Sequence, residues 1–132
     1  MRRRFNRYFS AISEGDGQPI AINIETAIER NREFRSPLWT GENLRVVLMS
    51  IPVGGEIGVE IHENEDQFIK IESGRATVVF GSSSNVFDYQ RAVDDDFALI
   101  IPAGTWHNVI NTGRSPLKLF SVYAPVLTKN DE

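Results

Sequence analysis

The chain has 132 residues, a length that suits one domain with a single hydrophobic core. With 41% hydrophobic and 24% charged residues, its composition is that of a globular protein and excludes a chain disordered throughout. The net charge of −4 argues against nucleic acid as a partner, because surfaces that bind the phosphate backbone are basic.

Residues 1–36 are predicted to form an N-terminal arm that contains one short helix. The arm begins with a basic run, and Arg2 to Phe5 superficially resembles a twin-arginine export signal. Polar and charged residues interrupt the apolar region that should follow such a signal. The chain also lacks an apolar stretch near the ~20 residues of a membrane helix. We therefore expect a cytoplasmic protein that does not bind membranes.

The helix is predicted at residues 23–31. Ile24, Ala27 and Ile28 fall at the spacing of one helix face in this segment. We expect this apolar face to cover one edge of a sheet.

Residues 37–126 are predicted to form an all-β domain, followed by a mobile tail at 127–132. Short runs rich in β-branched and aromatic residues alternate with turn signals at intervals of roughly 8 to 12 residues, a spacing typical of antiparallel sandwiches and barrels. The runs occupy residues 44–51, 67–72, 76–80, 97–101 and 117–123.

The two histidines, His62 and His107, each lie beside a turn next to a predicted strand. In a strand, Glu60 and His62 would point the same way because alternate residues share a face. Gln67 follows the polar turn at 63–66, and it would meet them if this turn folds the chain back on itself. A carboxylate, an imidazole and an amide oxygen would then converge.

The segments around the histidines resemble the two motifs of the cupin superfamily. The first motif keeps its frame from Gly54 to Gly74, with His62 at its second histidine, while Glu60 takes the place of the first histidine and Gln67 that of the glutamate. The resemblance extends over about residues 40–125. The second motif, Pro-x-Gly-x-x-His-x-x-x-Asn, is complete with Pro102, Gly104, His107 and Asn111.

This resemblance implies a double-stranded β-helix, the jelly-roll or cupin barrel, and a metal site made by Glu60, His62, Gln67 and His107. Nitrogen and oxygen ligands without sulfur favour a divalent Mn, Fe, Co, Ni or Zn ion. Two other interpretations stay open, a metal-free pocket for a polar ligand and a purely structural role. The resemblance gives Asn111 a structural part, hydrogen bonding at the strand turn.

The sequence favours a metal-dependent enzyme that acts on a small oxygenated substrate, sugar-like or hydroxy-carbonyl, in an isomerase-like reaction. The first motif also resembles small single-domain cupins of the mannose-6-phosphate isomerase-like type. A metal-dependent dioxygenase and a non-catalytic small-ligand-binding protein are the alternatives. Candidate substrate contacts are Arg45, Met49 and Tyr123, although an arginine in an alternating strand more often faces solvent.

Outward apolar residues such as Phe68, together with the N-terminal arm, favour a two-fold dimer. We therefore expect a homodimer whose other partner is a small molecule.

Overall fold

The structure, a computed structural model, describes residues 16–125. The basic run at the N-terminus and the predicted mobile tail at 127–132 lie outside the described residues. Within the described range the chain forms one α-helix and eight strands. These are α2 (Ile24–Arg30), β1 (Arg35–Thr40), β2 (Arg45–Ile51), β3 (Asp66–Ser73), β4 (Ala76–Gly81), β5 (Tyr89–Val93), β6 (Ala98–Ile101), β7 (Trp106–Asn111) and β8 (Leu117–Ala124).

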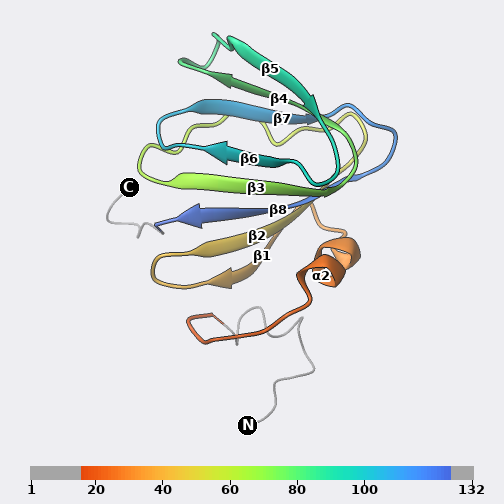
Figure 1. Cartoon of the computed structure of the whole chain (residues 1–132), viewed down its shortest axis with the longest axis vertical. Coiled ribbons are helices and arrows are strands. Elements are labelled where there is room, and N and C mark those ends of the chain that lie inside the picture. Colours follow the sequence, from red (N-terminus) through yellow and green to blue (C-terminus); the bar gives the residue numbers. More distant parts are fainter. Residues whose placement is uncertain (1–15, 126–132) are drawn as a thin grey trace.

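The strands form two antiparallel sheets, one in the order β1-β2-β8-β3-β6 and one in the order β5-β4-β7. Figure 1 shows them stacked from β5 to β1, with α2 beside the β1 and β2 end. All five predicted strand runs form strands, and the expected all-β double-stranded β-helix with one short helix is confirmed.

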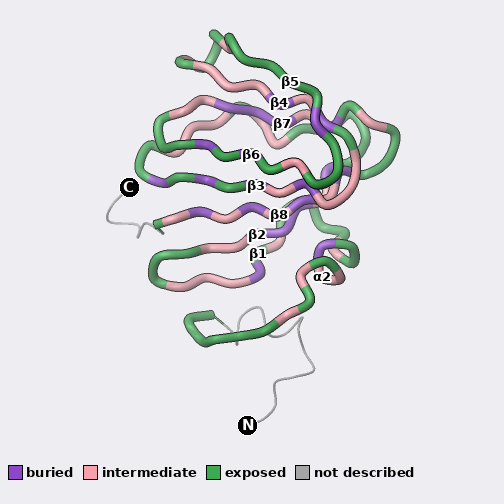
Figure 2. The backbone as a smooth tube through the Cα atoms, in the orientation of Figure 1, coloured by how far each residue is buried: buried purple, intermediate pink, exposed green. Residues whose placement is uncertain are grey.

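Burial alternates along the strands, most regularly in β3 and β8, because successive side chains point to opposite faces of a sheet. Figure 2 shows this alternation of buried and exposed positions. The inward-facing side chains of the two sheets build the main core. Its members are Val47, Met49, Ile51, Ile69, Ile71, Ala76, Val78, Val93, Leu99, Ile101, Val109, Leu117, Leu119 and Tyr123.

The predicted helix forms, and α2 covers part of the outer face of the larger sheet, whereas the sequence analysis expected it at an edge. Its N-terminus is capped by the Asn23 side chain, which accepts a hydrogen bond from the backbone N–H of Thr26 at 3.0 Å. Ile28 is fully buried and packs in a second cluster with Leu38 and Leu48. No helix in residues 16–125 is long and apolar enough to cross a membrane.

Phe68 and Ile100 are directly opposite each other on β3 and β6, and both are exposed, Ile100 to 72%. While these two side chains face water, they add little to the stability of the monomer. They are the surface that the predicted homodimer would bury.

We expect Ile100→Lys to shift the chain from dimer to monomer, because the dimer would have to bury the new charge. Sedimentation at tens of micromolar protein measures the shift. Val53→Lys, which alters an exposed apolar residue in the turn after β2, is the matched control. A wild-type chain that sediments only as monomer would contradict the dimer.

Asn111 holds two chain segments together at the end of β7. Its side-chain amide is buried and donates to the carbonyl oxygens of Ile51 at 2.9 Å and Ser115 at 3.0 Å. Its Oδ1 accepts from the backbone N–H of Gly113 at 2.9 Å. The structural role expected for Asn111 is therefore confirmed.

Asn111→Ala should lower the free energy of unfolding by about 2 to 4 kcal/mol, because the buried carbonyl of Ile51, the part-buried carbonyl of Ser115 and the N–H of Gly113 lose their partner. Urea unfolding measures this loss. Asn85→Ala, at an exposed position, should change stability by no more than about 0.5 kcal/mol. If Asn111 is purely structural, the folded variant binds metal as the wild type does.

Candidate metal centre

Glu60 and His107 lie side by side because their backbones pair. The N–H of each donates to the carbonyl of the other at 3.0 Å, which makes an isolated antiparallel bridge. Side chains of such a pair project from the same face. The sequence placed Glu60 and His62 on a strand, but residues 52–65 form no regular strand and pair with β7 through the isolated bridges of Glu56 and Glu60.

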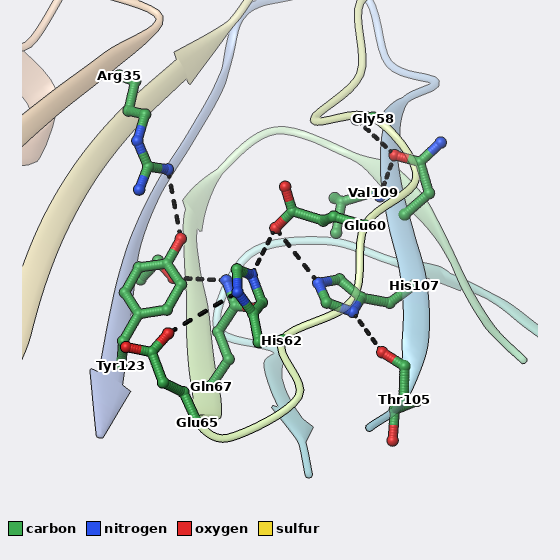
Figure 3. A network of polar contacts seen from close by, with 12 residues as sticks. Arg35, Gly58, Glu60, His62, Glu65, Gln67, Thr105, His107, Val109 and Tyr123 are labelled. Carbon is green, nitrogen blue, oxygen red and sulfur yellow. Dashed lines mark hydrogen bonds and ion pairs between the residues drawn. The ribbon is translucent and has the colours of Figure 1, made fainter. Parts of the chain in front are cut away.

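Asn108 fixes this irregular segment against β7, and sequence reasoning did not single it out. Its buried Oδ1 accepts from the N–H groups of Gly58 and Val109, both at 2.8 Å (Figure 3). Its Nδ2 donates to the Glu56 carboxylate at 2.6 Å. An asparagine directly after His107, within a strand rather than in a turn, was the available signal.

The turn before β7 holds the segment that carries His62. The backbone N–H of Gly104 donates to the carbonyl of His62 at 2.8 Å, and that of Ala103 donates to the Asp66 carboxylate at 2.9 Å. Gly104 has φ of +84°, and an added Cβ would meet no atom within 4 Å. The backbone conformation, and not space, therefore calls for glycine at this position.

Three candidate ligands converge at this end of the barrel. The Glu60 Oε1 atom lies 2.9 Å from His62 Nε2 and 3.5 Å from His107 Nε2. One ligand atom from each of the three residues lies within 4.8 Å of the other two. Figure 3 shows the Glu60 carboxylate between the two imidazole rings. The convergence of a carboxylate with both histidines agrees with the sequence prediction.

His107 presents a bare nitrogen to this cluster. The residue is 1% exposed, and its Nδ1 donates to the carbonyl oxygen of Thr105 at 2.9 Å. In the neutral ring the proton is therefore on Nδ1, and Nε2 is left as an acceptor. This buried Nε2 atom has no hydrogen-bond partner among the described residues. A proton or a metal ion would occupy the lone pair of Nε2. Of the two, only a metal ion would bind the ligand atoms of Glu60, His62 and His107 at the same time.

The Glu60 carboxylate is charged at neutral pH. Burial raises the pKa of its carboxyl, but the contacts with the ring nitrogens of His107 and His62, at 3.5 Å and 2.9 Å, and the positive charge these rings can carry outweigh burial and lower the pKa from 4.5 to about 2. A metal ion would therefore find this ligand already deprotonated.

Gln67 lies on β3, on the inward face. Its Nε2 donates to Ser121 Oγ at 2.8 Å, which leaves Oε1 as a buried acceptor without a partner among the described residues. In the strand register it is directly opposite Tyr123. A free amide oxygen suits the predicted fourth ligand, and this role stays a prediction.

The three candidate substrate contacts have different surroundings. Tyr123 is buried, with its ring edge-on to His62 at 5.3 Å between centroids. Arg45 is opposite Tyr123 in the register and shares the inward row with Val47. Its guanidinium carbon lies 4.5 Å from the Tyr123 ring centre, so Arg45 lies on the inward face and not in the solvent-facing alternative, and its contact with a substrate stays a prediction. Met49 packs in the core, and its contact with a substrate stays a prediction.

Sequence reasoning missed two charged residues beside the cluster. The Glu65 side chain is 7% exposed, and its Oε1 lies 3.8 Å from His62 Nδ1 and 3.9 Å from Arg45 Nη2. Arg35 donates to the Tyr123 hydroxyl at 3.3 Å. Glu65 is two residues before Gln67, so strand alternation was the signal that could have placed it on the inward face.

Comparison with known proteins agrees with the geometry. A family model described as Cupin domain matches residues 47–123. The uncharacterized protein YrkC of Bacillus subtilis (strain 168) is 54% identical over 108 residues, covering 82% of this chain and 58% of YrkC. The uncharacterized protein L612 of Acanthamoeba polyphaga mimivirus is 33% identical over 109 residues, covering 82% of this chain and 66% of L612. The chain thus spans less than two thirds of either relative.

A solved structure, BH2720 from Bacillus halodurans, is similar in both sequence and fold. It is 53% identical, with a TM-score of 0.82 over 84% of each chain. TT1209 from Thermus thermophilus, at 23% identity and a TM-score of 0.67, covers 80% of this chain and 96% of its own, and it supports the fold alone.

Because the pKa of Glu60 is lowered in the folded state, its ionisation stabilises the fold above about pH 4.5, and this contribution is lost as the pH falls to about 2. We expect the difference in unfolding free energy between metal-free wild type and Glu60→Gln to shrink across this window. Urea unfolding of chelator-treated protein measures it, with Glu63→Gln as the exposed control for loss of a charge. A difference that stays constant would contradict the lowered pKa.

Proposed function

The chain belongs to the cupin superfamily, and from this and the geometry of Glu60, His62 and His107 we propose that it is a metal-dependent enzyme for a small oxygenated substrate. One observation supports the metal more than any other. The buried Nε2 of His107 has no hydrogen-bond partner among the described residues, and it faces a carboxylate that also contacts the second histidine.

The donor set fits a divalent Mn, Fe, Co, Ni or Zn ion. Two imidazoles and one carboxylate exclude a thiolate site, and they suit these ions better than an all-oxygen magnesium or calcium site. With three protein ligands, or four if Gln67 contributes its Oε1, coordination positions are left for substrate. Such an ion would polarise a carbonyl or hydroxyl oxygen of the substrate as a Lewis acid.

The surrounding residues supply orientation and exclude water. Thr105 fixes the tautomer of His107 through its carbonyl, and Glu65 lies close enough to the Nδ1 atom of His62 to orient that ring. The buried ring of Tyr123 packs edge-on against His62 and shields that side of the imidazole from water. A sugar-like or hydroxy-carbonyl substrate and an isomerase-like reaction fit this arrangement. The resemblance of residues 54–74 to mannose-6-phosphate isomerase-like cupins supports the same class.

A second candidate is a metal-dependent dioxygenase. The specific observation is the donor set itself, because two histidines and one carboxylate with open positions are the ligands of non-haem iron(II) oxygenases. The identity of the metal that the native protein retains distinguishes the isomerase from the dioxygenase. Retained zinc or manganese with turnover of hydroxy-carbonyl sugars supports the isomerase. Retained iron with substrate-dependent oxygen consumption supports the dioxygenase, and ligand binding without turnover of any kind contradicts both.

Carboxylate substitutions test the ligand set. Glu60→Gln leaves the site without a carboxylate and should lose metal on dialysis. Gln67→Glu adds a second carboxylate, which attracts a divalent ion by several kcal/mol even at an effective dielectric of about 20, partly offset by desolvation. We expect metal affinity to rise about tenfold or more. The Ser121 hydroxyl can rotate to donate to the new carboxylate, so the fold should tolerate it.

Metal content after dialysis and competition with a chelator measure this series. The double exchange Glu60→Gln with Gln67→Glu should recover binding relative to Glu60→Gln alone. Gln90→Glu, on the exposed strand β5, is the matched control for added charge and should leave affinity unchanged. Affinities that do not follow the number of carboxylates at positions 60 and 67 would show that one of these residues is not a ligand.

A further inference from the structure

Two arginines lie beside the candidate metal ligands with most of their hydrogen-bonding capacity unused. Arg45 has one ion-pair contact among residues 16–125, to Glu65 at 3.9 Å, which is longer than a hydrogen bond. Its Nε atom is buried without a partner. Arg35 donates one long hydrogen bond of 3.3 Å to the Tyr123 hydroxyl, a neutral acceptor. A guanidinium group has five N–H donors, so both groups can bind another acceptor.

Arg45 and Arg35 both contact the ring of Tyr123, which also contacts the candidate metal ligand His62. The guanidinium carbons of Arg45 and Arg35 lie 4.5 Å and 5.7 Å from the centre of the Tyr123 ring. The ring of His62 lies 5.3 Å from it on another side. Figure 3 shows Arg35 above the Tyr123 hydroxyl, with His62 and Glu60 beyond the ring. The Glu65 Oε1 atom lies 3.8 Å from His62 Nδ1 and 3.9 Å from Arg45 Nη2, so the Arg45 guanidinium group and a candidate metal ligand are close enough for one small molecule to contact both.

The charges around the site favour an anion once a metal ion is bound. Among the residues in contact with the ligand cluster, Arg35 and Arg45 balance Glu60 and Glu65, so a divalent ion would add positive charge beside the two guanidinium groups. The Arg45 and Glu65 side chains are largely withdrawn from solvent, and water screens charges less there than at an open surface. Planar guanidinium groups bind carboxylate and phosphate through two parallel hydrogen bonds.

We infer that Arg45 and Arg35 form an oxyanion-binding subsite, so that the substrate of the proposed enzyme carries a carboxylate or phosphate group next to the oxygen that the metal polarises. This inference rests on the proposed function. It narrows the substrate from a neutral sugar or hydroxy-carbonyl compound to a small hydroxy acid or a phosphorylated equivalent. Arg45 contributes from the inward row of β2, and Arg35 approaches from the exposed start of β1.

Calorimetric titration of the metal-loaded protein tests the subsite with matched probes. Lactate and glycerol 3-phosphate carry the two oxyanions, and lactamide and glycerol are their neutral counterparts. Arg45→Gln and Arg35→Gln should each weaken anion binding about tenfold to a hundredfold, as expected for loss of a charge-assisted hydrogen bond. Binding of the neutral probes should not change. The anion that binds more tightly to the wild type identifies the oxyanion of the substrate.

A matched control arginine is available on the opposite side of the barrel. Arg91 lies over the Phe97 ring at 5.2 Å, which reproduces the arginine–aromatic contact away from the site, so Arg91→Gln should leave anion affinity unchanged. Arg45→Lys keeps the positive charge but lacks the planar guanidinium group, so it should retain part of the anion affinity. Partial retention would show that the loss in Arg45→Gln is not caused by misfolding.

Two results would overturn the subsite. Either the variant with both Arg35→Gln and Arg45→Gln binds lactate and glycerol 3-phosphate as tightly as the wild type, or lactamide binds as tightly as lactate. Metal content measured on the same samples keeps this failure separate from failure of the proposed function. A protein that retains metal but binds anions without the arginines refutes the subsite alone. A protein that binds anions through the arginines but takes up no metal refutes the metal centre alone.

Discussion

The backbone pair between Glu60 and His107 is the constraint on which the site depends. His107 lies on β7, whose register with β4 is fixed along six residue pairs. Glu60 belongs to a segment without regular strand structure, yet two hydrogen bonds of 3.0 Å attach it directly to His107. A carboxylate from a loop is thereby positioned as accurately as a residue within a sheet. Asn108, which accepts from Gly58 and donates to Glu56, secures the rest of that loop.

The position of Glu60 determines which charge the site requires. A carboxylate held beside two imidazoles, and partly withdrawn from water, is stable only if those rings or a bound cation compensate it. The carbonyl of Thr105 accepts a hydrogen bond from the Nδ1–H group of His107. The neutral ring therefore presents only the lone pair of Nε2 to Glu60. A neutral His62 ring can donate to Glu60 from Nε2 at 2.9 Å, and a bound cation would supply the positive charge that the carboxylate otherwise lacks. Arg45 does not supply it, because its guanidinium group is directed to Glu65 and Tyr123.

Local sequence was sufficient for the five predicted strands, the helix and the convergence of Glu60, His62 and His107, because period-two alternation, turn residues and motif spacing are encoded within short segments. It did not predict β1 or β5, each of which has a single buried residue. It was insufficient where partners are distant in the chain. Asn108 and Gly58 are 50 residues apart, and Arg35 and Tyr123 are 88 apart. The pattern left Arg45 between a substrate contact and the solvent face, because only the distant partners Tyr123 and Glu65 place it on the inward face. Glu65 was overlooked because an acidic turn ordinarily faces water.

The hydrogen bonds from Gly104 to His62 and from Ala103 to Asp66 tie the two loops at this end of the barrel to each other. Loops held in this way have little conformational entropy left to lose when a ligand arrives, so more of the interaction energy appears as affinity. The site is then preorganised, and its choice of ligand depends on shape and charge, and not on closure of a lid. Structures of the free and liganded protein should superimpose closely at residues 60–66 and 102–105.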